Sequence, residues 1–349
     1  MGKIHRGGLI GGFDRLKESP IVYSGVWDLR QQGVAQKGDR WQQYVDMTGR
    51  AILGGGFYTD YSNVLEYVAI QTTGNSTDFG NLTQARYGIC GSSSSTRGLK
   101  WQGMPHPGTI EGTQSIDFVT IATTGDASDF GDCAHLNRRC GALANDTRSV
   151  KAGGNGVNQD LMEYVTIAST GNTTSFGDLL DSTNNGNLGG GSNTTRGVYV
   201  GRFETDTGND GDRIQYITIA STGNATDFGN LSLVSSSGAS GNSSTRITFA
   251  GGYNFSNAAT ADIVYITTAS TGNSSDFGDL TLARYFQSGA SDKLRAVIGG
   301  GRNSGGTYVD NIDYITIGTT GNATDFGDLL APRATWASTD ISSTHGGLA

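Results

Sequence analysis

Short runs in which apolar and polar side chains alternate recur along most of the chain. Four regular runs begin with Tyr and end with Ile, at residues 67–70, 164–167, 216–219 and 314–317. Alternation with a period of two over β-branched and aromatic residues predicts β-strands. The segments between the runs are rich in Gly, Asn, Ser and Thr, which favour turns. The pattern therefore predicts an all-β chain of many short strands.

A nine-residue motif follows these strands and occurs six times. Its first copy is Thr-Thr-Gly-Asn-Ser-Thr-Asp-Phe-Gly, which begins at Thr72. An aromatic strand residue precedes the Phe of the motif by 12 residues in every copy, so this hairpin is predicted to be a fixed structural part. The Phe residues are separated by 51, 46, 52, 49 and 49 positions and are Phe79, Phe130, Phe176, Phe228, Phe277 and Phe326. A period near 50 residues is typical of the blades of kelch-type β-propellers.

Each repeat opens at an Arg and contains four short predicted strands. The spacing from this Arg to the strand aromatic varies between 16 and 21 residues, so length variation is concentrated in the loop between the first two strands. We therefore expect a six-bladed β-propeller over residues 50–349, with these variable loops on one face of the disc. The expected repeats are about 50–96, 97–147, 148–195, 196–245, 246–294 and 295–349.

The last residues of the chain repeat the opening of the unit. In the segment 343–349, His345 stands where Arg97 and Arg148 stand in other copies. Because an open propeller exposes strand edges, we expect the two ends of the repeat region to meet in one blade or in its neighbour. Which terminal strand completes the ring stays open at this point.

The first 49 residues lack the repeat and predict an N-terminal docking arm. Ser24 is a suitable N-cap for a small helix that carries Trp27 and Leu29. Residues 1–50 hold eight Lys and Arg against five Asp and Glu, whereas the rest of the chain has a net charge of -11. We expect Trp27, Leu29 and Trp41 to be buried against a partner. The alternative is a strap folded against the propeller.

The repeated charged residues are predicted to be structural and to pair across or between blades. Sixfold repetition argues against catalysis, which needs one asymmetric constellation of groups. Calcium binding by the Asp-rich turns is a lesser alternative, because the spacing lacks the Asp-x-Asp-x-Asp-Gly loop. The residues concerned are Asp78, Asp129, Asp227, Asp276, Asp325, Arg50, Arg97, Arg148, Arg196, Arg246 and Arg295.

Aromatic residues in the variable loops are candidates for binding. If they share one face, they provide a surface that stacks on sugar rings or docks a protein. The alternative is that several of them fill the core of the propeller. The candidates are Tyr58, Tyr61, Trp101, His106, Phe203, Tyr253, Phe255 and Tyr308.

Composition and charge exclude several classes of function. The net charge of -8 and the isoelectric point of about 4.9 argue against an electrostatic grip on nucleic acid or on anionic lipid. No run of 18 apolar residues occurs, so no transmembrane helix and no membrane insertion are expected. The three Cys are predicted to be small buried hydrophobes. The four His are scattered without a metal-binding spacing, so we expect no metal, no cofactor and no catalytic residue.

The blade motif resembles kelch-like repeats in structural proteins of tailed, notably marine, bacteriophages. The resemblance rests on the sequence Tyr-x-Thr-Ile followed by the nine-residue motif, and on the Leu-x-x-x-Arg that comes after it, as in Leu82 to Arg86, Leu280 to Arg284 and Leu329 to Arg333. The Ser-Gly-Val-Trp-x-Leu segment near the start is similar to segments of other phage virion proteins. The resemblance covers most of the chain and implies a virion component, with a place in the tail.

We therefore expect a non-enzymatic phage structural protein that is present in several copies. Its arm would attach to other virion proteins, and its propeller would contact a protein or the host surface. One alternative is a lectin-like adhesin that binds a host glycan or protein receptor. A second alternative is a propeller hydrolase that degrades polysaccharide.

Overall fold

The computed structural model describes residues 49–107, 111–181, 188–201, 212–232, 238–253, 258–335 and 339–348. Within these ranges the chain is all β and contains no α-helix, which confirms the predicted class. The search of these residues for a helix able to cross a bilayer finds none. The expected small helix and the residues Trp27, Leu29 and Trp41 lie outside the described residues.

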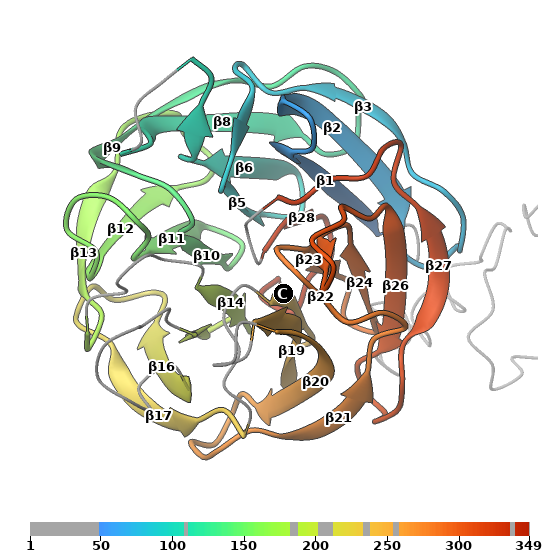
Figure 1. Cartoon of the computed structure of the whole chain (residues 1–349). Coiled ribbons are helices and arrows are strands. Elements are labelled where there is room, and N and C mark those ends of the chain that lie inside the picture. Colours follow the sequence, from blue (N-terminus) through green and yellow to red (C-terminus); the bar gives the residue numbers. More distant parts are fainter. Residues whose placement is uncertain are drawn as a thin grey trace, which may run out of the picture. The chain divides into compact units, whose positions relative to one another are not determined.

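Six four-stranded antiparallel sheets surround a central axis in the described part of the chain, which is the predicted six-bladed β-propeller (Figure 1). From the axis outward, blade 1 consists of β28 (Ile341–Ser342), β1 (Arg50–Phe57), β2 (Tyr61–Ala69) and β3 (Thr77–Asn81). Blade 2 consists of β5 (Cys90–Ser93), β6 (Arg97–Trp101), β8 (Thr113–Thr120) and β9 (Ser128–Asn137). Blade 3 consists of β10 (Gly141–Ala144), β11 (Arg148–Ala152), β12 (Leu161–Thr166) and β13 (Thr174–Asp178).

The other three blades follow the same plan. Blade 4 consists of β14 (Gly189–Ser192), β15 (Arg196–Val200), β16 (Arg213–Thr218) and β17 (Thr226–Asn230). Blade 5 consists of β18 (Ala239–Asn242), β19 (Arg246–Tyr253), β20 (Ala259–Thr267) and β21 (Ser275–Asp279). Blade 6 consists of β23 (Ser288–Ser291), β24 (Arg295–Gly299), β26 (Asn311–Thr316) and β27 (Thr324–Asp328). Two small ribbons pair β4 (Arg86–Tyr87) with β7 (Met104–Pro105) and β22 (Arg284–Tyr285) with β25 (Arg302–Asn303).

The sheets are offset by one strand from the sequence repeats. The innermost strand of a blade comes from the end of the preceding repeat, as β5 precedes Arg97 in blade 2. The same offset closes the ring, because β28 supplies the innermost strand of blade 1 (Figure 1). Ile341 pairs with Ile52, and Ser342 pairs with Ala51. The two ends of the repeat region therefore meet in one blade, as expected.

The prediction that His345 replaces the repeated Arg is wrong. In blade 1 that place belongs to Arg50, whose backbone N–H donates to Ser343 Oγ at 3.0 Å. In blade 2 the backbone N–H of Arg97 donates to Ser94 Oγ at 3.1 Å in the same way. Because the closing sheet takes its second strand from the other end of the repeat region, the C-terminal segment has no Arg to supply, and His345 turns toward the axis.

The hydrophobic core lies between neighbouring blades. One cluster joins Leu99 of blade 2 to Val165 of blade 3, and five further clusters likewise draw on adjacent sheets. The three cysteines, Cys90, Cys133 and Cys140, are free thiols buried in this first cluster, which confirms the prediction that they act as small hydrophobes. A blade therefore buries its apolar faces only when both neighbours are in place.

The nine-residue motif forms the outer joint between blades. Its Thr-Gly-Asn turn lies on the Phe-Gly strand of the preceding blade, so that the N–H of Gly223 donates to the Phe176 carbonyl at 2.8 Å. The side-chain Oδ1 of Asn224 accepts the N–H of Asp178 at 3.1 Å. The equivalent Gly-to-Phe bonds measure 2.7–2.8 Å at all six joints, including the closing bond from Gly74 to Phe326.

The repeated Arg forms a second joint, which supports its predicted structural role but with a different partner. The guanidinium of Arg97 lies 4.6 Å from the ring centroid of Phe118 in its own blade and donates to the Ile167 carbonyl of the next blade at 2.9 Å. All six blades repeat this arrangement, and the Arg295-to-Ile70 bond closes the ring. The repeated Asp residues are instead exposed on the outermost strands.

Replacing Gly177 by Ala tests the outer joint. Gly177 has a φ of +149°, and a Cβ there would lie 2.3 Å from the carbonyl oxygen of Gly223. We expect the substitution to lower the free energy of unfolding by about 1–3 kcal/mol, since backbone strain and overpacking coincide. The control is Gly223→Ala, which shares a positive φ of +157° but has no atom within 4 Å of the added Cβ. Chemical denaturation that shows equal losses for both variants would contradict this account of the joint.

Candidate functional site

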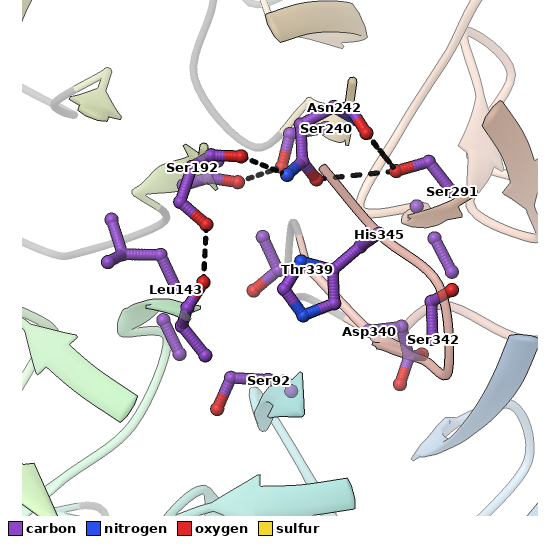
Figure 2. Close-up of a pocket in the computed structure, with 17 residues that line it drawn as sticks. Ser92, Leu143, Ser192, Ser240, Asn242, Ser291, Thr339, Asp340, Ser342 and His345 are labelled. Carbon is purple, nitrogen blue, oxygen red and sulfur yellow. Dashed lines mark hydrogen bonds between the residues drawn. The ribbon is translucent and has the colours of Figure 1, made fainter. Parts of the chain in front are cut away.

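A small polar pocket lies on the propeller axis. Its wall is formed by the innermost strands, whose Gly and Ser residues allow close approach; a Cβ on Gly289 would lie 2.4 Å from the Ser240 carbonyl oxygen. The cavity volume of about 30 Å³ has room for roughly one or two water molecules and no larger ligand. Figure 2 shows the side chains that line it, with His345 in their midst.

The hydroxyl groups of this pocket join successive blades. Ser192 Oγ donates to the Ala144 carbonyl at 2.7 Å, and Ser240 Oγ donates to the Gly190 carbonyl at 2.5 Å. Beside the pocket, Ser93 Oγ donates to the Ser342 carbonyl at 2.6 Å. Lys100 and Asp340 form an ion pair in which both side chains are buried. Burial raises the pKa of the Asp340 carboxyl, although the Lys100 ammonium opposes this effect. Ser93 and Lys100 of blade 2 therefore hold the C-terminal segment against the axis.

His345 anchors that segment as a neutral imidazole. Its Nδ1 accepts the N–H of Gly347 at 3.0 Å, so its Nε2 carries the hydrogen and donates to the Ser93 carbonyl at 2.8 Å. Burial lowers the pKa of His345 below the usual 6.5, because the charged form would lose its hydration. A proton added to Nδ1 would also break the bond from Gly347.

The His345 contacts predict a loss of stability in mild acid. Because the folded state has the lower pKa, the contribution of His345 is present above about pH 6.5 and is lost as the pH falls through that value toward the folded pKa. Melting temperatures should therefore fall between about pH 7.5 and about pH 5.5. The fall should be smaller in His345→Gln, whereas a replacement of the exposed His106 should leave it unchanged. If the melting temperature of the His345→Gln variant fell as much as that of the unaltered protein, His345 would not be the group responsible.

A cluster of aromatic rings forms where the loops of several blades meet. Tyr61 stacks on His106 with ring centroids 4.8 Å apart and lies 5.2 Å from Tyr87. Tyr58 packs edge-to-face on Tyr308, with centroids 5.6 Å apart. We call the following six residues the aromatic surface: Phe57, Tyr58, Tyr61, Tyr87, His106 and Tyr308. Four of the expected loop candidates, Tyr58, Tyr61, His106 and Tyr308, thus come together.

Arg302 connects this surface to a second group of rings. Its guanidinium carbon lies 4.8 Å from the Tyr308 ring centroid and 6.0 Å from that of Tyr285. Tyr253, another expected candidate, stacks on Tyr285 with centroids 3.8 Å apart. Burial raises the pKa of Tyr61, Tyr253 and Tyr308 further above neutral pH, and these phenols, protonated like any tyrosine, can donate hydrogen bonds.

Buried ion pairs fix the base of these rings. Arg86, which precedes Tyr87 in β4, pairs with Asp117 at 2.9 Å, and both side chains are fully buried. Arg284, which precedes Tyr285 in β22, pairs with Asp313 at 3.2 Å in an equally buried position. Removing one partner of such a pair typically costs about 3–5 kcal/mol. The backbone next to Tyr87 and Tyr285 is therefore held in place by buried ion pairs.

Sequence analysis alone missed several residues of this region. These are Phe57, Tyr87, Tyr285, Phe286 and Arg302. The signal that could have found the two tyrosines is the Ala-Arg-Tyr triplet, which occurs at residues 85–87 and again at 283–285. The Arg of this triplet is also the last residue of the phage-like Leu-x-x-x-Arg pattern.

Trp101 does not belong to the aromatic surface. Its side chain is fully buried in the cluster between blades 2 and 3, and its Nε1 donates to Ser92 Oγ at 2.9 Å. The alternative reading, that some loop aromatics fill the core, is correct for this residue, because Trp101 ends strand β6 and points inward. Phe203 and Phe255 lie outside the described residues.

Two substitutions separate the core from the surface. Trp101→Ala should lower the free energy of unfolding by about 3–5 kcal/mol, since it opens a cavity between two blades. Tyr58→Ala should change it by no more than about 0.5 kcal/mol, because this ring is 46% exposed. Denaturation curves of the two purified variants check both values. A tolerated Trp101→Ala, or a large loss in Tyr58→Ala, would contradict these placements.

Comparisons with known proteins do not assign the chain to a family. No protein-family model matches it, and a search of curated proteins finds no match. In the part of the chain that the structure describes, no group of three or more His, Cys, Asp and Glu side chains is placed to hold a metal ion.

Proposed function

We propose that this protein is a non-enzymatic structural component of a phage virion, in which the propeller contacts another surface and the first 49 residues attach it to the particle. The aromatic surface is the observation that carries the contact role. Half-exposed tyrosines combine an apolar body with a polar tip, which suits them to binding interfaces. The resemblance of the repeat to phage structural proteins supports the place in the virion, and specifically in the tail.

The departure from sixfold symmetry supports the choice of this surface. The repeated Phe, Gly and Arg residues make equivalent contacts at all six joints, and these contacts hold the blades together. The rings of the aromatic surface lie on loops and adjoining strand ends near blades 1, 2 and 6, and these segments differ in length and sequence. A rigid disc with one distinctive loop region is a common arrangement for recognition.

Rigidity of the supports favours binding with little loss of entropy. Tyr87 follows a fully buried Arg, and Phe57 forms a backbone bridge to Ala334, which follows the buried Arg333. Arg333 in turn pairs with the buried Glu66. Ordering of side chains on binding costs about 0.5–1.5 kcal/mol per flexible residue, and rings that are already held in place avoid much of that cost.

Attachment to particles tests this function. Purified full-length protein should bind to virions that were assembled without it, and the double variant Trp27→Ala/Trp41→Ala should bind at least about tenfold less, because two large apolar contacts of the arm are lost. Tyr58→Ala serves as the control and should attach normally. Immunogold electron microscopy with an antibody against the propeller measures attachment.

Two results would contradict the proposal. One is that purified virions of the virus that encodes the chain never contain it. The other is that the double variant attaches as well as the unaltered protein. Circular dichroism of both variants must first show an intact propeller, so that a failure to attach is not a failure to fold.

A further inference from the structure

We propose that the aromatic surface binds an acidic polysaccharide, with a sugar ring stacked on the exposed aromatic rings and its carboxylate held by Arg302. This inference rests on the proposed contact function and names the class of its ligand.

Cations gather around the aromatic surface although the chain as a whole is acidic. The net charge of the chain is -8. Arg302 lies against Tyr308, and Arg138 donates from Nη1 to the sulfur of Met104 at 3.1 Å, next to Tyr87. The side chain of Arg139 lies against Gly88 and interacts with Tyr87. Local positive charge on an acidic protein favours an anionic ligand at this place and repels it elsewhere.

Arg302 retains donors for a carboxylate. Its Nε donates to the Gly306 carbonyl at 3.0 Å, and the guanidinium lies over the Tyr308 ring. In the described residues neither Nη atom of Arg302 takes part in a hydrogen bond, so both can donate to an anion. The planar guanidinium fork matches the two oxygens of a carboxylate, which makes such bonds strong and directional.

The exposed rings offer platforms of the size of one sugar. Tyr58 is 46% exposed, and the side chain of His106 is 55% exposed. Each is backed by a second ring, Tyr58 by Tyr308 at 80° and His106 by Tyr61 at 17°. A backed ring keeps its orientation, so the apolar face of a pyranose can stack on it without ordering the side chain first.

The small number of exposed hydrophobic side chains argues against a protein as the main partner. A protein interface needs a fully desolvated core of several apolar side chains. Five large hydrophobic residues in the described part of the chain are substantially exposed, and only Tyr58 among them belongs to the aromatic surface. Asp60 is the acid that faces His106, at 3.8 Å, and it is 73% exposed, so solvent screens its charge.

Binding of defined polysaccharides tests the proposal. The probes are polygalacturonate, alginate and hyaluronate, each compared with its carboxyl-reduced, neutral form by biolayer interferometry with the full-length protein. At least one acidic polymer should bind, its neutral form should bind at least about tenfold more weakly, and raising the salt concentration should weaken the acidic polymer further.

Three variants locate the site. Arg302→Gln and Tyr58→Ala should each weaken the acidic polymer by about tenfold, through the loss of the charge-assisted bonds and of the stacking platform respectively. Arg213→Gln is the matched control. Arg213 lies in blade 4, away from the aromatic surface; it is partly exposed like Arg302, but it already pairs with Asp181. This variant should bind as the unaltered protein does.

Several outcomes would overturn the proposal. These are no binding to any of the three acidic polymers, equal binding to the neutral forms, or full binding by Arg302→Gln. A further outcome is that adsorption of virions to cells depends on Tyr58 although the purified protein binds none of the three polymers. That result would indicate a protein receptor and would also overturn the proposal. Failure of the virion role is distinguishable, because it appears as missing attachment to particles while the purified protein still binds the polymer.

Discussion

The joint between neighbouring blades is the constraint on which the whole ring depends. A four-stranded sheet on its own leaves strand edges and apolar faces exposed to water. The turn that contains Gly223 covers both the strand edge and the apolar face. The N–H of Gly223 pairs with the carbonyl of Phe176, and the side chain of Phe176 fills the core between the blades. The same residues thus specify the turn, the hydrogen bonds of the joint and the packing under it. This explains why nine consecutive positions recur so closely in all six copies.

Closure of the ring requires a second kind of contact, at the propeller axis. At the rim, the bonds from Gly74 to Phe326 and from Arg295 to Ile70 are the same as those between any two blades. At the axis, β28 must come from the far end of the repeat region, and His345 holds it against Ser93 of blade 2. Contacts between segments so far apart in the sequence are costly in chain entropy, and the neutral His345 and the hydroxyl groups around it stabilise them in the folded state.

The repeat made the architecture predictable, whereas the single-copy features escaped prediction. Period-two alternation and the fixed spacing to Phe79 predicted six blades of four strands, because both follow directly from local chemistry. The partner of Arg97 was not predictable, since the Ile167 carbonyl is a backbone group with no signature in the sequence. Trp101 was placed on a loop although it ends a strand, because variable loop length hides the strand's last residue. The aromatic surface needed the three-dimensional proximity of Tyr61 and Tyr87, which belong to different blades.

The charges beneath the aromatic surface explain how a cationic region arises on an acidic chain. Glu66, Asp117 and Asp313 lie in the third strands of their blades, and each is fully buried with an Arg as its partner. A buried pair is close to neutral from outside, so these carboxylates add little negative potential to the loops above them. The Arg residues that support the rings therefore also neutralise the acids buried beneath them, whereas the exposed Asp60, which faces His106 at 3.8 Å, is screened by solvent. The same buried ion pairs thereby contribute both to the rigidity of the aromatic surface and to its positive charge.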